Sequence, residues 1–169
     1  MYIRAYTVRR NRYDVWGFGM IKIRTAAARD AEALHRLDEQ TAQPGCHASI
    51  EDWRSALARA DVTVHLAEDN ALPVGYAVLV RGALPKAGVP TLRLEALAVR
   101  AAWRGAGVGR RLVRAAAQTA TGQAATVCAV HPADGDAQGF FRRLGAEISP
   151  ALSIRLAPEP ERAVAGRAA

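Results

Sequence analysis

Cysteine is scarce in this chain of 169 residues, which contains only Cys46 and Cys128. Two cysteines are too few for a disulfide scaffold and indicate reduced thiols, as in a cytoplasmic protein. Long apolar runs are missing too: no segment is long enough to span a bilayer, and no apolar stretch follows the arginines of residues 9–12 as a secretory signal requires. These absences predict one soluble cytoplasmic domain with no membrane partner.

Lysine is nearly absent as well. Lys22 and Lys86 are the only lysines among 23 basic residues, so the formal net charge of +7 comes from arginines spread along the chain. A nucleic-acid surface gathers its positive charges on one face, whereas these follow an alanine-rich and arginine-rich composition. Nucleic acid is therefore not an expected partner. The basic segment 1–19 keeps open a different class, an interaction module that binds through this arm.

The chain divides into three parts. Residues 1–19 show no sustained period and predict a basic arm or an extra strand, with Met20 as a candidate natural start. Residues 158–169 are small and charged, which predicts a disordered tail. Residues 20–157 form the domain, in which strand and helix patterns alternate and predict an α/β or α+β fold with a central, mostly antiparallel sheet.

The expected elements follow from periodicity and punctuation. A helix over 28–40 has Thr25 and Asp30 as cap candidates, and a second helix opens at Ser49 with Glu51 and Asp52 in its first turn. The sequence NALP predicts a hairpin between two strands. The expected strands cover 20–26, 62–69, 74–82, 91–100, 125–130 and 148–157, and the later helices cover 108–120 and 137–146.

Gly105, Gly107 and Gly109 stand at every second position between a predicted strand and a predicted helix. Such a loop offers bare backbone N–H groups and the positive end of the helix dipole to an anion. No lysine follows the glycines as in a Walker A loop. Arg110 replaces the third glycine of a dinucleotide fingerprint, and no acidic residue follows about 20 residues on. An ordinary strand-to-helix turn is the remaining alternative.

The stretch AVRAAWRGAGVGRRLV resembles the Arg-x-x-Gly-x-Gly/Ala signature of the GCN5-related N-acetyltransferase (GNAT) superfamily, here R-G-A-G-V-G. The order of elements from about Met20 to Leu156 is also similar to that fold. The resemblance implies a mixed sheet of six to seven strands, about four helices, and acetyl-CoA as cosubstrate. It implies that the pantetheine and acetyl group lie along Leu97, Ala98 and Val99, and that the pyrophosphate is bound by Arg104, Gly105, Ala106, Gly107, Val108, Gly109 and Arg110.

Glu95 is the candidate general base for acetyl transfer. An alkyl amine with a pKa of ~10.4 is almost fully protonated near neutral pH, so the reaction needs a group that takes its proton, directly or through water. The two-residue strand period places Glu95 on one face with Leu97 and Val99, and similar polyamine acetyltransferases have a glutamate at the matching position. A solvated strand residue, paired with Arg93, is the alternative. Backbone N–H groups near Leu97–Val99 are candidates to stabilise the oxyanion.

Phe141 stands where many members of the superfamily have a tyrosine that protonates the CoA thiolate. Phenylalanine cannot donate a proton. Either water suffices, since a thiol with a pKa of ~8.5 leaves tolerably as a thiolate, or one of His131, Cys128 and Tyr76 replaces the tyrosine. The difference also leaves open a catalytically weak domain that binds CoA as a sensor.

Acidic residues gather between Arg36 and Arg54, a region without lysine or arginine that holds Asp38, Glu39, Glu51 and Asp52. In the superfamily this region walls the acceptor site, and negative charge there concentrates a cationic ligand. We expect a primary amine, bound through Asp38, Glu39 and Tyr76.

The loop of residues 41–48 is short and favours a small molecule over the alternatives, a protein N-terminus or a lysine. Cys46-His47 and Cys128-x-x-His131 lack the paired spacing of zinc ligands, so no metal is expected. The sequence leaves a homodimer open.

Overall fold

The computed structural model describes residues 21–42, 46–83, 90–123, 126–130, 135–145, 147–149 and 153–156. Its strands form one seven-stranded sheet in the order β1-β2-β3-β4-β5-β7-β6. All neighbouring strands are antiparallel except β4 and β5, which are parallel. The strands are β1 (Lys22–Thr25), β2 (Val62–Asp69), β3 (Leu72–Ala83), β4 (Pro90–Val99), β5 (Thr126–Val130), β6 (Glu147–Ser149) and β7 (Ser153–Leu156).

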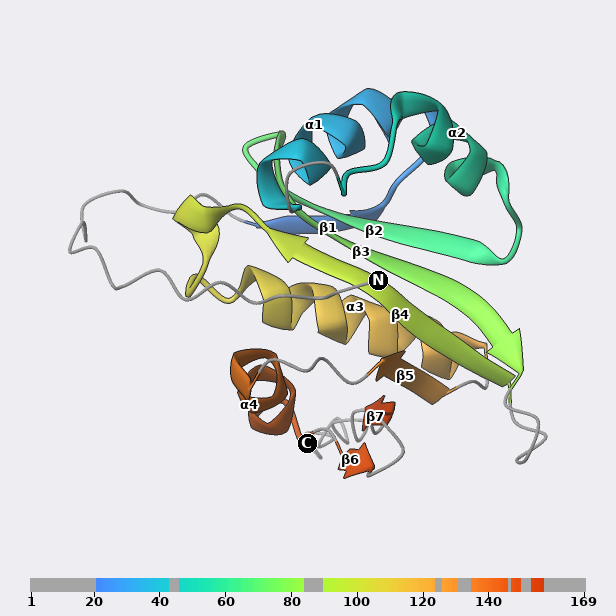
Figure 1. The fold of residues 1–169 in the computed structure, drawn as a ribbon, viewed down its shortest axis with the longest axis vertical. Helices are drawn as coiled ribbons and strands as arrows, with labels where there is room; N and C mark the ends of the chain where they lie inside the picture. The colour runs from blue at the N-terminus through green and yellow to red at the C-terminus, as the bar shows by residue number, and fades with distance from the viewer. Residues whose placement is uncertain are drawn as a thin grey trace, which may run out of the picture.

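The helices cover both faces of this sheet. Figure 1 shows α1 and α2 on one face and α3 on the other, with α4 on the α3 side. The expected α+β class with a mostly antiparallel sheet is therefore confirmed. The helices of the described residues are α1 (Ala31–Thr41), α2 (Ile50–Ala58), α3 (Val108–Gly122) and α4 (Gly135–Arg143), with 3₁₀ turns η1 (Ala28–Asp30) and η2 (Ala101–Trp103).

The end of the sheet differs from the sequence expectation. One strand was expected over 148–157, but the structure has two, β6 and β7, which pair antiparallel with Ser149 opposite Ser153. The sequence between them contains Pro150, which has no N–H to donate to a strand ladder and favours a break. The arm 1–19, Met20 and the tail 158–169 lie outside the described residues.

Two hydrophobic clusters hold the layers together. The α3-side cluster fills the space between the sheet and α3, with Leu94 and Leu112 fully buried at its centre. The α1/α2-side cluster packs Leu34 and Leu37 of α1 and Trp53 of α2 against the other face. None of the helices in the described ranges has the length and apolar character needed to cross a membrane.

An ion-pair network joins the first strand to the first helix. The guanidinium of Arg24 donates to both carboxylate oxygens of Asp30 at 2.8 Å and to Glu68 Oε1 at 2.7 Å. Asp30 was expected to cap α1, but its carboxylate makes no cap bond to that helix and instead accepts from Ala27 N at 2.8 Å. The hydrogen bonds from Arg24 hold the pKa of Asp30 below its usual range. Arg24 therefore fixes α1 against β1 and β2.

Replacing Arg24 with glutamine should lower the free energy of unfolding at pH 7 by about 1–3 kcal/mol, because two partly buried carboxylates lose a charged donor. A lowered folded-state pKa stabilises the fold above the unfolded value of ~3.9, and this contribution disappears as the pH falls through the folded pKa. The difference between wild type and variant should therefore shrink towards pH 3 in urea unfolding curves. Arg36→Gln is the control, since Arg36 is 70% exposed beside Glu32. Equal losses in both variants at pH 7 would contradict this role.

Candidate functional site

β4 pairs with β5 only along its first half. The parallel register runs from Thr91 opposite Thr126 to Leu94 opposite Ala129, whereas β4 continues to Val99. Beyond Leu94, the β5-facing edge of β4 has no strand partner among the described residues. Unpaired strand edges present backbone N–H and C=O groups that can pair with an extended ligand. Residues 95–99 are therefore called the open edge of β4.

A β-bulge marks the start of the open edge. On β3, Val78 is opposite Ala96 and Leu79 is opposite Leu94, so Glu95 has no counterpart in the ladder. A bulge inserts one residue and re-aims the side chains that follow. Glu95 therefore occupies the point at which β4 leaves β5.

The bulge corrects one expectation from the sequence. An unbroken two-residue period would place Glu95 on one face with Leu97 and Val99. Instead, Leu97 and Val99 pack against the α3-side cluster, in which Leu94 is also buried, because the extra residue shifts the alternation by one. Ala98 packs on the α1/α2 side.

Glu95 is paired with Arg93. The Arg93 guanidinium donates to Glu95 Oε1, as the alternative interpretation of the sequence anticipated. The two side chains differ in exposure: 13% for Glu95 and 56% for Arg93. The largely buried Glu95 carboxylate is thus paired with a long, exposed arginine side chain on its solvent side.

The glycine loop connects the open edge to α3. Gly105 and Gly107 have φ values of 83° and 81°, a left-handed conformation that favours glycine, and the space beside their Cα atoms is open. Gly107 is the N-cap of α3 and supplies no side-chain cap. The first N–H groups of a helix lack intrahelical acceptors and lie at the positive end of its dipole. The loop thus presents N–H groups at this end of α3, and binding of an anion there stays a prediction.

The residues flanking the loop fix its position. Val108 is 1% exposed, and Ala106 packs beside it against the α3-side cluster. Arg104 Nε donates to the Val99 carbonyl at 3.1 Å, which ties the loop back to the end of β4. The ring of Phe140 lies so close to Gly109 that a Cβ there would be 3.3 Å from it. Arg110 is exposed on the first turn of α3.

Phe141 is part of the core. It is 1% exposed in the α3-side cluster and contacts Phe140 edge to face at a centroid distance of 5.1 Å. Of the candidate replacements for the missing tyrosine, His131 lies outside the described residues, and only the backbone of Cys128 is described. The hydroxyl of Tyr76 donates to Asp38.

Asp38 and Tyr76 form a buried pair between α1 and β3. The Tyr76 hydroxyl donates to Asp38 Oδ1 at 2.6 Å, and Ala48 N donates to Oδ2 at 2.8 Å. Burial, together with the hydrogen bond to Asp38, raises the pKa of Tyr76. The observed contacts of this pair join α1 to the sheet and to the segment that precedes α2. A substrate contact for either residue stays a prediction.

The other acidic residues of this region differ in their surroundings. Ser49 and Asp52 form the expected capping box of α2, and Glu51 pairs with Arg54 at 3.2 Å. Glu39 is 47% exposed, and its Oε1 lies 3.7 Å from His35 Nε2 and 3.9 Å from the Nε2 of His47. Glu39 is thus an exposed carboxylate that lies beside two histidines.

His35 of α1 contacts the segment that precedes α2, which also carries His47. His35 Nδ1 lies 2.8 Å from the Ala48 carbonyl, which can only accept, so the proton is on Nδ1. In the described part of the chain, no group of three His, Cys, Asp or Glu side chains is arranged to hold a metal ion.

The family model of the acetyltransferase (GNAT) family matches residues 22–146. The chain belongs to this family, and its open edge of β4 and its glycine loop lie within the matched residues. No curated protein sequence matches it.

Solved structures with the same fold differ in what they act on. A PaiA N-acetyltransferase from Thermoplasma acidophilum, in complex with coenzyme A, has a TM-score of 0.63 at 16% identity and covers 80% of this chain and 96% of its own. A ribosomal-protein-alanine N-acetyltransferase from Brucella melitensis has a TM-score of 0.60 at 17% identity, covering 73% and 90%. An aminoglycoside acetyltransferase from a soil metagenome, in complex with sisomicin, has a TM-score of 0.62 at 23% identity. The match covers 73% of this chain and 86% of the other.

Gly107→Ala should reduce stability, since an L-residue in the left-handed region costs roughly 1–2 kcal/mol even where the space is open. Gly122→Ala is the matched control: it ends the same helix, has no positive φ and also meets nothing within 4 Å. This change should be neutral or stabilising by about 0.4–1 kcal/mol. Urea unfolding of both variants provides the measurement. If Gly107→Ala is as stable as Gly122→Ala, the loop does not require the left-handed conformation.

Proposed function

We propose that the protein is an N-acetyltransferase that moves an acetyl group from acetyl-CoA to a primary amine of a small molecule, with Glu95 as general base. One observation carries the proposal: the open edge of β4 begins at the bulged Glu95 and leads into an uncapped helix N-terminus. The open edge would bind the pantetheine arm and the helix N-terminus the pyrophosphate, and Glu95 lies at the far end of the open edge from the glycine loop.

The residues present fit acetyl-CoA. The loop Arg104–Gly107 and the first turn of α3, including Val108, Gly109 and Arg110, offer N–H donors and positive charge for a pyrophosphate. The backbone of Leu97, Ala98 and Val99 offers the edge groups with which a pantetheine amide chain can pair. Acetyl-CoA would supply the electrophile, an acetyl thioester.

Glu95 accepts the proton of the attacking amine, directly or through water, while backbone N–H groups of the open edge stabilise negative charge on the carbonyl oxygen. Overall, the arriving ammonium loses one proton to water and a second to Glu95 as the nitrogen gains the acetyl group; Glu95 passes its proton to water, and the CoA would leave as a thiolate that solvent protonates. The buried Phe141 donates none. Solvent protonation is sufficient in this scheme because a thiol with a pKa of ~8.5 is a good leaving group.

Glu95→Gln should reduce kcat/KM by roughly 10²–10⁴, the usual contribution of a general base, with the Kd of acetyl-CoA unchanged. Labelled acetyl-CoA is incubated with a cell extract that is then split by size, so that the acceptor class is assigned in the same assay. Glu32→Gln is the control, because Glu32 is a 60% exposed carboxylate on α1 paired with Arg36. A Glu95→Gln enzyme as active as Glu32→Gln would refute the assignment.

The size fractions separate two kinds of acceptor. Label in the small-molecule fraction supports the proposal, whereas label in the macromolecular fraction favours a protein N-terminus or lysine. Tight acetyl-CoA binding without transfer into either fraction favours the CoA sensor, the function that the buried Phe141 supports.

Asp38, Glu39 and Tyr76 are proposed to form the acceptor site: Glu39 attracts the amine, and the buried Asp38–Tyr76 pair holds the wall of the site in place. Glu39→Gln should raise the acceptor KM about two- to fivefold, as expected for an exposed ion pair, without loss of stability.

Asp38→Asn should lower the free energy of unfolding by about 1–3 kcal/mol, because the Tyr76 hydroxyl and Ala48 N–H lose a charged acceptor. Steady-state kinetics and urea unfolding test the two expectations. An unchanged KM in Glu39→Gln would remove Glu39 from the site.

A further inference from the structure

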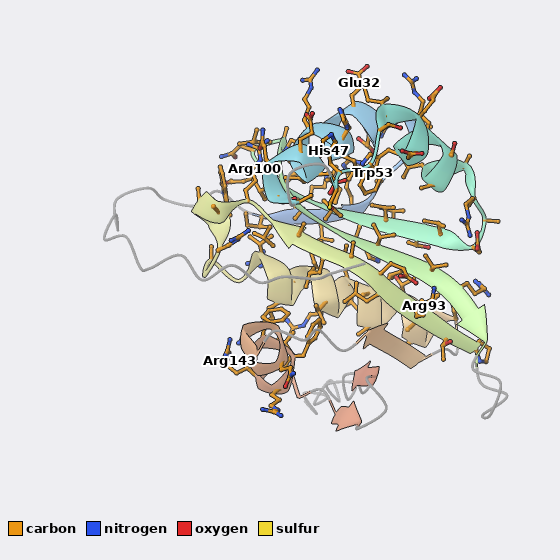
Figure 2. The ribbon with its side chains drawn as sticks, viewed as in Figure 1. Glu32, His47, Trp53, Arg93, Arg100 and Arg143 are labelled. Carbon is orange, nitrogen blue, oxygen red and sulfur yellow. The ribbon has the colours of Figure 1, made fainter. Side chains whose placement is uncertain are left out.

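Arg100 extends the path of β4 beyond its last residue. It lies outside the strand, with a φ of −50° and a ψ of 141°, and its N–H donates to the Val74 carbonyl at 2.9 Å. Within the strand, Val99 packs towards α3 and Ala98 towards α1 and α2. Figure 2 shows Arg100 at the end of β4, on the side of α1.

The guanidinium of Arg100 lacks a partner in the described part of the chain. Its Nε is buried and makes no hydrogen bond there. Burying part of a permanent positive charge without an acceptor is unfavourable. By contrast, Arg24, Arg54, Arg59 and Arg93 are all paired with carboxylates. Arg100 therefore has an unmet requirement for an oxygen acceptor.

The protein's own carboxylates do not meet this requirement. Asp69 is the last residue of β2, and its Oδ2 accepts from Trp103 Nε1 at 3.0 Å. Trp103 in turn packs on the α3-side cluster. Both oxygens of Asp38 are hydrogen-bonded, to Tyr76 and Ala48. The indole N–H of Trp53, in the α1/α2 layer, is a second buried donor without a partner in the described residues. Asp69 Oδ1 is a buried acceptor that also lacks a partner in the described residues, and it makes no hydrogen bond with Arg100. An oxygen-bearing ligand would therefore give the buried Nε of Arg100 the acceptor that the described residues do not.

We propose that Arg100 binds an oxyanion of the acceptor, so that the substrate is an amine that also carries a carboxylate or a phosphate, as an amino acid does. A guanidinium binds such groups through two parallel hydrogen bonds. Leu97 and Arg100 are three residues apart, about 10 Å along a strand, a span that an amino acid and the arginine side chain can bridge together. The inference rests on the proposed acetyl transfer and names its substrate class.

The position of Arg100 separates this role from cofactor binding. The glycine loop leads into the N-terminus of α3, and Val99 packs towards α3, whereas Arg100 lies on the side of α1 (Figure 2). Changing Arg100 should therefore alter the acceptor KM and leave the Kd of acetyl-CoA unchanged.

The experiment compares matched acceptors with the full chain and acetyl-CoA, by release of the CoA thiol. The acceptors are the common amino acids, their uncharged carboxamides, O-phosphoethanolamine and spermidine. The charged-oxygen amines should exceed their amides by about tenfold or more in kcat/KM, the usual effect of a charged hydrogen-bond pair. Carboxylate and phosphate arms distinguish the two sources of the oxyanion. Arg100→Gln should abolish the preference through KM, and Arg100→Lys should restore part of it.

Arg36→Gln, an exposed arginine change on α1, is the control and should keep the preference. The same compounds are also tested for binding to the CoA-loaded protein by calorimetry, so the outcome does not depend on turnover. If neither transfer nor binding distinguishes oxyanion from amide, or if Arg100→Gln weakens acetyl-CoA binding equally, the inference is overturned. Acetylation of spermidine without any oxyanion preference would overturn it and leave the acetyltransferase intact. Oxyanion binding at Arg100 without transfer would support it and refute the proposed reaction.

Discussion

The pairing of β4 is the constraint on which the rest of the structure depends. β4 must stay bonded to β3 along its length, yet it bonds to β5 only as far as Leu94. The bulge at Glu95 makes this compatible, since an extra residue increases the local twist and turns the second half of the strand away. α3 then begins directly beyond this opening, because η2 and the glycine loop return the chain to the same end of the sheet. An open edge and a helix N-terminus thus follow from one interrupted ladder.

The layer of α1 and α2 depends on polar contacts made from one helix. His35 and Asp38, three residues apart on α1, hold the carbonyl and the N–H of Ala48. Asp38 also accepts from Tyr76, which contacts Trp53 edge to face at 5.2 Å. These contacts fix the segment that carries His47 and starts α2. The wall of the proposed acceptor site is thus supported from its buried side, which leaves Glu39 exposed.

Much of the fold could be predicted from local patterns, because caps, turns and alternation are encoded within a few residues. The bounds of β2 and the Ser49 cap of α2 agree with the sequence expectation. The bulge could not be predicted, since an inserted residue changes which face a side chain takes without changing composition. The burial of Asp38 could not be predicted from its place in an acidic region, because it depends on Tyr76 of β3, distant in sequence. Arg100 gave no signal among many arginines, since only tertiary structure shows that its Nε is buried without a partner in the described residues.

The Arg93–Glu95 pair bears on how a base can work in this position. A carboxylate that must receive an ammonium group has to be ionised and oriented before the substrate arrives, and Arg93 provides a cation in that place. Arg93 is 56% exposed, so water can solvate it when the pair separates, whereas the less exposed Glu95 then needs another cation in its place. Glu95 is 13% exposed and anchored at the bulge, so it keeps its position when the arginine moves into solvent. In the proposed reaction an arriving amine would replace the guanidinium at the same oxygen, and the salt bridge would be the resting state of the proposed base.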